Sequence, residues 1–284
     1  MITEVNQVFQ KVSPSKKQID DSISLFDKKM SKEFEEAARA YEKRAHLMSN
    51  VIKPFQGSHD IKPESADSSF RSLKDLVMTE HEHQRYKLTH DISDVEVRKT
   101  FMLKIDDRLR IMGPPYDVEW TNGVIGYAKK NVGEFGITPM NGNAAAAVGE
   151  YISPAQDVIA RFTAYVPISF SWLNWIINSG YASTNGGIGV LVYDLSNGSI
   201  LADNRSVLWN NTRTSPGLSN QPETMTYLSY TSAGETYFAM RGGGLYLVWV
   251  WCWSSANFSG NVALSMSSIA CKMPFMVVKP WLSI

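Results

Sequence analysis

The chain has 284 residues, with 28 basic and 28 acidic side chains and two cysteines. Its zero formal net charge argues against a nucleic-acid binder that works by bulk charge, because such binding requires neutralisation of phosphates. Two cysteines are too few for a disulfide framework, although Cys252 and Cys271 could form one disulfide.

The N-terminal residues are polar, and the chain contains no run of about 18 apolar residues. We therefore expect neither a Sec signal peptide nor a transmembrane helix. The corresponding expectation for localisation is a virion or other particle, or release without a Sec signal.

Charge divides the chain into two parts. Residues 1–112 contain 39 charged side chains, whereas residues 113–284 contain 17 and hold all eight tryptophans. The change falls in residues 113–123, where Gly113-Pro114-Pro115 would end a helix. We predict a helical bundle or oligomerisation stalk over residues 1–112, a linker over 113–123 and a β-sandwich head over 124–284.

The first part has the periodicity of helices. Over residues 14–49, apolar side chains recur at an average spacing near 3.6, and Ser13-Pro14 is a suitable helix start. The stripe consists of Ile19, Ile23, Phe26, Met30, Phe34, Ala37, Tyr41, Ala45 and Met48. Further helices are predicted over 67–89 and 93–112. Three such helices could form an antiparallel bundle or an oligomeric stalk.

The second part has the pattern of short strands. Residues 158–170 alternate as one strand, in which Pro167 indicates an edge or a bulge. Asn197-Gly198 predicts a hairpin turn, and residues 172–180 predict a short helix that ends at Gly180. Seven or eight strands favour a sandwich or jelly roll. The predicted fold class is α+β: three N-terminal helices followed by an antiparallel β-sandwich or jelly roll.

The segment LYLVWVWCWS, residues 245–254, predicts a strand with two apolar faces. Its three alternating tryptophans are bulky for one sandwich core, in which inner faces pack about 10 Å apart. They could lie in the core, contact another subunit, or form a platform for a sugar or lipid. The candidate interface or ligand residues are Trp249, Trp251, Trp253, Trp172 and Trp175.

The sequence contains no catalytic or metal-binding motif with the residue spacing that such a motif requires. On a helix, His81 and His83 would lie about 200° apart, so they favour a solvated face over a metal site. The glycine runs at 186–189 and 242–244 match neither a phosphate loop nor a dinucleotide fingerprint, and they predict loops or bulges between strands. We expect no enzymatic activity, no cofactor and no metal.

Charge-poor surfaces suit burial between subunits, and here a charge-poor β part follows a charged helical segment. We expect a non-enzymatic assembly or attachment protein, a homo-oligomeric subunit of a virion or phage-tail-like particle. The expected partners are further copies of the chain, a trimer being one arrangement, other particle subunits, and a cell-surface glycan or receptor, but no nucleic acid. The alternative is a pore-forming or receptor-binding toxin with a lectin-like β-sandwich, in which a hairpin over 245–272 touches lipid or glycan.

Overall fold

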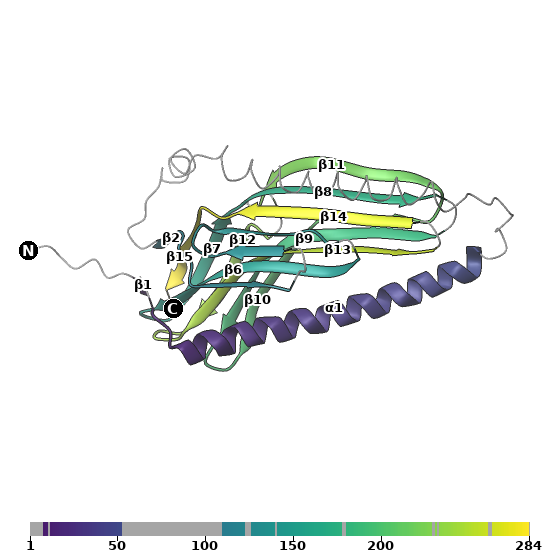
Figure 1. Ribbon diagram of the computed structural model, residues 1–284. Helices are drawn as coiled ribbons and strands as arrows, with labels where there is room; N and C mark the ends of the chain where they lie inside the picture. The colour runs from purple at the N-terminus through teal and green to yellow at the C-terminus, as the bar shows by residue number, and fades with distance from the viewer. Residues whose placement is uncertain are drawn as a thin grey trace, which may run out of the picture.

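The structure, a computed structural model, describes residues 8–10, 12–52, 110–122, 126–139, 141–177, 180–228, 231, 233–260 and 263–283. Within these ranges the chain forms one helix, α1 (Lys16–Ile52), and fifteen strands (Figure 1). The strands are β1 (Phe9–Gln10), β2 (Arg110–Met112), β3 (Val118–Thr121), β4 (Gly126–Lys129), β5 (Glu134–Ile137), β6 (Gly142–Pro154), β7 (Val158–Tyr165), β8 (Pro167–Ile176), β9 (Tyr181–Asp194), β10 (Ser199–Arg213), β11 (Gly217–Tyr227), β12 (Glu235–Met240), β13 (Tyr246–Ser259), β14 (Ala263–Lys272) and β15 (Phe275–Ser283).

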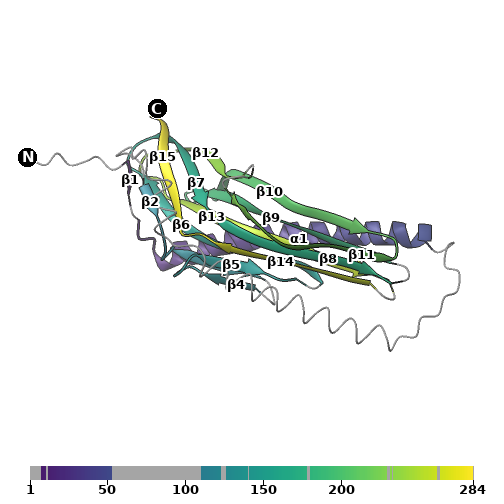
Figure 2. The ribbon, with the colours of Figure 1, turned by 90° about the horizontal axis from the view of Figure 1, so that it is seen from above.

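The strands form three antiparallel sheets. The six-stranded sheet has the order β1-β6-β13-β9-β10, with β3 also paired to β6, and the five-stranded sheet has the order β11-β8-β14-β5-β4. The four-stranded sheet has the order β12-β7-β15-β2 and lies toward the end where β1 enters the fold (Figures 1 and 2). The two larger sheets share one buried core, to which Val250 of β13 and Ile269 of β14 both belong. They therefore form a sandwich.

The first predicted helix is confirmed, with a different start. Ser15 donates its backbone N–H to Oε1 of Gln18 at 2.9 Å, and the N–H of Gln18 donates to the Ser15 hydroxyl at 3.3 Å. This reciprocal pair is a capping box, so Ser15 rather than Ser13 caps α1. Phe26 and Met30 in the predicted stripe are fully buried, and they pack against the six-stranded sheet.

The predicted fold class, three helices followed by one sandwich, is wrong. The described residues are mostly β, in three sheets, and α1 is their one helix. The helix expected over 67–89 lies outside the described residues, as does most of that over 93–112, whereas residues 110–112 form β2 and pair with β15. Residues 118–121, within the expected linker, form β3 and pair with β6. An amphipathic helix needs an apolar partner, and here the sheet supplies it.

Two local predictions in the β part are corrected. Residues 158–170 form two strands in different sheets, because β7 ends at Tyr165 and β8 begins at Pro167. Residues 172–180 contain the end of strand β8 rather than a helix. Apolar side chains lie on both faces there, since Trp172 packs on the main core and Trp175 on a separate cluster. Burial on both faces imitates the spacing of a helix.

The hairpin prediction is confirmed. Strands β9 and β10 pair from Asp194 and Ser199 onward, on either side of Asn197-Gly198. Gly198 has a φ of 71°, in the left-handed region that a glycine adopts without steric cost. The glycine run at 242–244 also lies between strands as predicted, and Gly243 has a φ of 73°.

Candidate functional site

The two faces of β13 contact different parts of the same chain. On one face, Val248, Val250 and Cys252 join the main core between the two larger sheets. On the other face, Trp249 and Trp251 join a second buried cluster that includes residues of α1. The sequence left open whether the tryptophans face the sandwich interior or a neighbouring subunit. The structure places α1 of the same chain over them.

Phe26 anchors α1 on this tryptophan face. Its ring centroid lies 4.7 Å from that of Trp249 and 6.3 Å from that of Trp251. One turn earlier, the hydroxyls of Ser22 and Tyr151 are 2.7 Å apart in a buried hydrogen bond between α1 and β6. These contacts hold the first half of α1 against the sheet.

Strand β9 places glycines opposite two of the indoles. Gly187 pairs with Trp253, and Gly189 pairs with Trp251. A Cβ atom at Gly187 would lie 2.4 Å from Cζ2 of Trp253, and one at Gly189 would lie 2.8 Å from Nε1 of Trp251. The prediction that residues 186–189 lie between strands is therefore wrong. They lie within β9, where the missing side chains make room for the indoles.

Four charged side chains connect α1 to β10, and we call them the α1–β10 ion-pair network: Lys29, Glu33, Asp203 and Arg205. Lys29 Nζ lies 2.6 Å from Glu33 Oε1 and 2.8 Å from Asp203 Oδ2. Arg205 Nη2 lies 2.7 Å from both Glu33 Oε1 and Asp203 Oδ2. The Arg205 guanidinium carbon also lies 4.9 Å from the Trp251 ring centroid, within the range of a cation–π contact.

The network fixes the charge of its two carboxylates. Burial alone would raise the pKa of Glu33, but hydrogen bonds from Arg205 and Lys29 and their positive charges lower it below its ordinary value. The same balance lowers the pKa of Asp203. Both carboxylates are therefore anionic at neutral pH, and burial costs are outweighed by the charge-assisted bonds.

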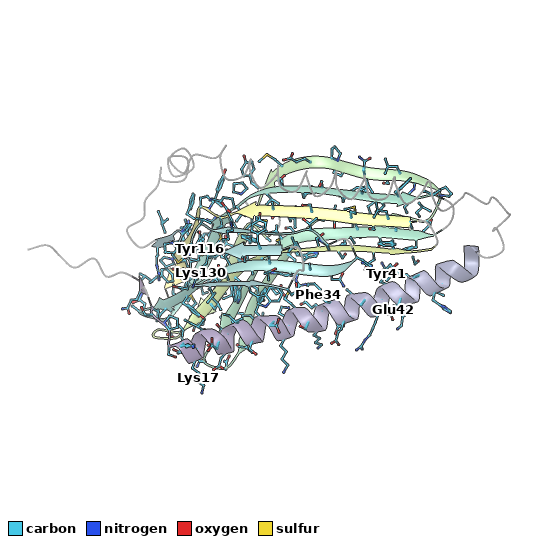
Figure 3. All side chains as sticks on the ribbon, in the orientation of Figure 1. Lys17, Phe34, Tyr41, Glu42, Tyr116 and Lys130 are labelled. Carbon is cyan, nitrogen blue, oxygen red and sulfur yellow. The ribbon has the colours of Figure 1, made fainter. Side chains whose placement is uncertain are left out.

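A cavity of about 480 Å³ lies between α1 and the sheet, and we call it the α1 groove. Farther along the helix, Tyr41 meets Tyr181 of β9 with ring centroids 5.4 Å apart. Figure 3 shows Phe34 and Tyr41 on the side of α1 that faces the sheets and Lys17 on the opposite side. The groove is lined by Glu33, Phe34, Glu36, Ala37, Asn143, Asn185, Arg205, Trp251, Trp253, Ser254 and Ser255.

The side-chain amide of Asn185 positions the Trp253 indole, which lines this groove. Trp253 is partly buried, and its Nε1 donates to Oδ1 of Asn185 at 3.0 Å. Ser255 donates its hydroxyl to the backbone oxygen of Asn185 at 3.4 Å. Across the groove, Nδ2 of Asn143 donates to the backbone oxygen of Phe34 at 3.4 Å. The groove thus combines an aromatic surface with hydrogen-bonding groups, as small-molecule sites do.

The five predicted site residues do not form one surface. Trp249 and Trp251 are buried beneath α1, and Trp253 lines the α1 groove. Trp172 packs against the main core from β8, while Trp175 packs in a separate cluster. Of the five, Trp251 and Trp253 therefore lie at the groove.

The polar residues that line the groove were not predicted from the sequence. Asn143 on β6, Asn185 on β9 and Glu36 on α1 come from segments far apart in the sequence. The antiparallel register places Ser255 opposite both Asn143 and Asn185. The signal in the sequence was limited to the alternation of β13, which shows that Ser255 shares a face with the tryptophans.

The segment 245–272, expected as a membrane-touching hairpin in the toxin alternative, does not form a paired hairpin. β13 lies between β6 and β9 in one sheet, and β14 lies between β8 and β5 in another. Both strands are central in their sheets and largely buried. The described part of the chain also has no helix that is long and apolar enough to cross a membrane.

Both cysteines are buried thiols at facing positions of the two larger sheets. Cys252 of β13 and Cys271 of β14 are free, so they form no disulfide. Burial, together with the neighbouring Cys252, raises the pKa of the Cys271 thiol well above its usual range. His81 and His83 lie outside the described residues. Within the residues described, no three metal-ligating side chains come together.

The outward face of the four-stranded sheet carries exposed aromatic side chains. Trp281 is 52% exposed and Tyr237 is 44% exposed, and their ring centroids lie 5.4 Å apart. Arg161 forms an ion pair with Glu235 and lies 5.9 Å from the Trp281 ring centroid. We call this surface the outer patch, and it consists of Ile111, Arg161, Glu235, Tyr237, Lys279 and Trp281.

Comparisons with known proteins give no family. No protein-family model matches the chain, and no curated protein sequence matches it. Among solved structures, an isomalto-dextranase of Arthrobacter globiformis T6 complexed with panose is 8% identical, with a TM-score of 0.21 over 60% of this chain and 23% of that one. The VP2 protein of infectious bursal disease virus is 9% identical, with a TM-score of 0.18 over 61% of this chain and 36% of that one.

Tailspike protein 4 of bacteriophage CBA120 is 13% identical, with a TM-score of 0.17 over 58% of this chain and 19% of that one. In each of these three cases the alignment spans well under two thirds of the other protein. TM-scores this low do not establish a shared fold. Function is therefore inferred from this chain's own side chains.

Proposed function

We propose that the protein is a non-enzymatic attachment subunit of a homo-oligomeric particle, of the virion or phage-tail kind. The observation that carries this proposal is the α1 groove, where the fold holds an indole and amide groups ready to contact a ligand. Two of its charged members, Glu33 and Arg205, already neutralise each other, which supports binding rather than proton transfer. The groove is lined by α1 and by four strands, β6, β9, β10 and β13, so a ligand in it could contact several elements at once.

The outer patch is the proposed contact between subunits. Trp, Tyr and Arg side chains are enriched at the energetic centres of protein interfaces, and this surface presents all three. The patch also carries Glu235 and Lys279. When two copies meet through this patch, Glu235 of each copy can therefore pair with Lys279 of the other. We therefore assign the patch to another copy of the same chain.

Light scattering on the full-length protein at micromolar concentration tests this role. We expect the mass of an oligomer, and a shift toward the monomer when Tyr237 and Trp281 are both replaced by serine. Ile200→Ser is the matched control, since Ile200 is 46% exposed on β10, which belongs to the six-stranded sheet and not to the sheet that carries the patch. A monomeric wild-type protein, or an oligomer unaffected by the double replacement, contradicts the proposal.

A further inference from the structure

We infer that the α1 groove binds an uncharged saccharide, an inference that rests on the proposed attachment role and names its ligand. The first support is the position of Trp253. Its six-membered ring lies against Gly187, where a Cβ atom would be 2.4 Å away, and the same indole lines the groove. A flat aromatic surface matches the C–H face of a sugar ring, which is apolar although the ring edge is polar.

The indole is also held in one orientation. Nε1 donates to Asn185, and the Trp253 ring centroid lies 5.0 Å from that of Trp251, which is itself fully buried. A ligand that stacks on Trp253 therefore does not need to order a mobile side chain first. Such preorganisation lowers the entropic cost of binding.

Polar groups surround this indole in the pattern that sugar hydroxyls require. Hydroxyls both donate and accept, so a saccharide site needs donors and acceptors together. Among the described residues, Nδ2 of Asn185 and Oδ1 of Asn143 have no hydrogen-bond partner, which leaves one donor and one acceptor for a ligand. Glu36 adds a carboxylate acceptor at the rim. The hydroxyl of Ser255 lies beside the same indole.

The charges at the groove favour an uncharged sugar over an acidic one. Two carboxylates, Glu33 and Glu36, line the groove beside one guanidinium, that of Arg205. Arg205 already donates to Glu33 and Asp203, so it is committed to the α1–β10 ion-pair network. A carboxylate on the ligand would meet like charges without a cation of its own, which costs binding energy.

The dimensions and polarity of the groove also argue for a sugar. A volume of about 480 Å³ falls within the range of about 300–1,000 Å³ for small-molecule sites. An acyl chain would leave Oδ1 of Asn143 and Nδ2 of Asn185 without polar partners, and burial of unpaired polar groups is unfavourable. A short saccharide can satisfy both the indole and the amides.

The test is a glycan array probed with the fluorescently labelled full-length protein, followed by calorimetric titration with the best soluble oligosaccharide. The array should contain neutral hexose and N-acetylhexosamine oligosaccharides, together with sialylated and uronic-acid forms of the same chains. We expect binding to neutral members and weaker binding to their acidic counterparts. Binding only to acidic glycans, or to none, overturns the inference.

Variants then place the binding at the groove. Trp253→Ala should weaken binding by about tenfold, equivalent to about 1.4 kcal/mol, since the aromatic contact is lost. Trp253→Phe should retain part of it. Asn143→Ala, which leaves the indole in place, should also reduce affinity and guards against a folding artefact at Trp253. Leu218→Ala is the matched control, because it truncates a side chain that is 53% exposed on β11, outside both the groove and the outer patch.

Different experimental results would overturn the saccharide inference and the proposed function. The oligomer is measured by light scattering, and the groove variants should keep the wild-type mass. If the array is negative while the oligomer forms and binds host cells, the saccharide is wrong and attachment stands. If glycan binding is kept in both Trp253→Ala and Asn143→Ala, or is lost equally in Leu218→Ala, the assignment to the α1 groove is overturned.

Discussion

Arg205 on β10 forms a two-point ion pair with Glu33 on α1, with Nη1 2.8 Å from Oε2 and Nη2 2.7 Å from Oε1. Such parallel bonds are among the stronger charge-assisted contacts in proteins. This pair joins segments 172 residues apart in the sequence and lies directly over Trp251. It therefore couples the position of the helix to the tryptophan face and to the adjacent groove.

Removal of this pair should loosen α1. Arg205→Ala is expected to lower the free energy of unfolding by about 1–2 kcal/mol, because Glu33 and Asp203 both lose a charged donor. Urea denaturation followed by tryptophan fluorescence measures the loss. Arg39→Ala is the control, since Arg39 and Glu35 form an exposed pair at 3.4 Å. Equal effects of the two replacements would show that the network does not stabilise the helix.

The same network predicts a loss of stability in acid. The pKa values of Glu33 and Asp203 are lowered in the folded state. A lowered folded-state pKa gives stability that is present above the unfolded-state pKa, about 4, and is lost as the pH falls below it. Melting temperatures between pH 7 and pH 3 should therefore fall more steeply in the wild type than in a Glu33→Gln, Asp203→Asn double variant. Parallel curves would contradict the assignment.

Phe26 should be the costliest single contact of α1 to lose. Phe26→Ala is expected to destabilise the fold by about 3–5 kcal/mol, the usual cost of truncating a fully buried phenylalanine. Emission from Trp249 and Trp251 should shift to longer wavelength as water reaches them. Leu47→Ala, at a position 64% exposed on the same helix, should change neither quantity. A small effect at Phe26 would mean that the helix does not pack as described.

The glycines beneath the indoles should tolerate alanine unequally. At Gly187 a Cβ atom would meet the backbone oxygen of Ser206 at 2.2 Å as well as Trp253. At Gly149 it would meet only side chains, the closest being Trp249 at 2.9 Å. Gly187→Ala should therefore cost about 1–3 kcal/mol or more, and Gly149→Ala less. Thermal unfolding of the two variants compares them directly, and the reverse order would contradict the packing.

The two thiols should be unreactive in the folded protein. Cys252 and Cys271 are buried, and the pKa of Cys271 is raised, so little thiolate is available to a reagent. Iodoacetamide should label neither cysteine at pH 8 without denaturant and both in 6 M urea, as counted by mass spectrometry. Rapid labelling of the folded protein would show that the space between the two sheets is open.

The sequence predicted elements better than it predicted their partners. The stripe from Ile19 to Tyr41 identified α1 because a helix period is a local property of the chain. That stripe could equally have packed on other helices. It packs on the sheet because Trp249 and Trp251, which are distant from it in the sequence, lie against it in the fold. The apolar spacing at Trp172 and Trp175 suggested a helix because a strand buried on both faces loses its alternation.

The groove could be predicted only in part. Alternation in β13 correctly grouped Trp249, Trp251 and Trp253 on one face. Asn143 and Asn185 join Trp253 only through the register of three strands, and register depends on pairings that no single segment encodes. The α1 groove also depends on how the part of α1 from Phe26 to Tyr41 lies relative to the sheet, which is a tertiary property.

Hydrogen–deuterium exchange of the intact protein, resolved to peptides from α1, tests most directly whether the helix lies on the tryptophan face of its own chain. A free helix is marginally stable and exchanges its amides rapidly. We predict that residues 19–34 exchange at least about 100-fold more slowly than an unstructured peptide, and that Phe26→Ala removes this protection without affecting β14. Exchange of residues 19–34 at nearly the unstructured rate in the wild-type protein would contradict the account.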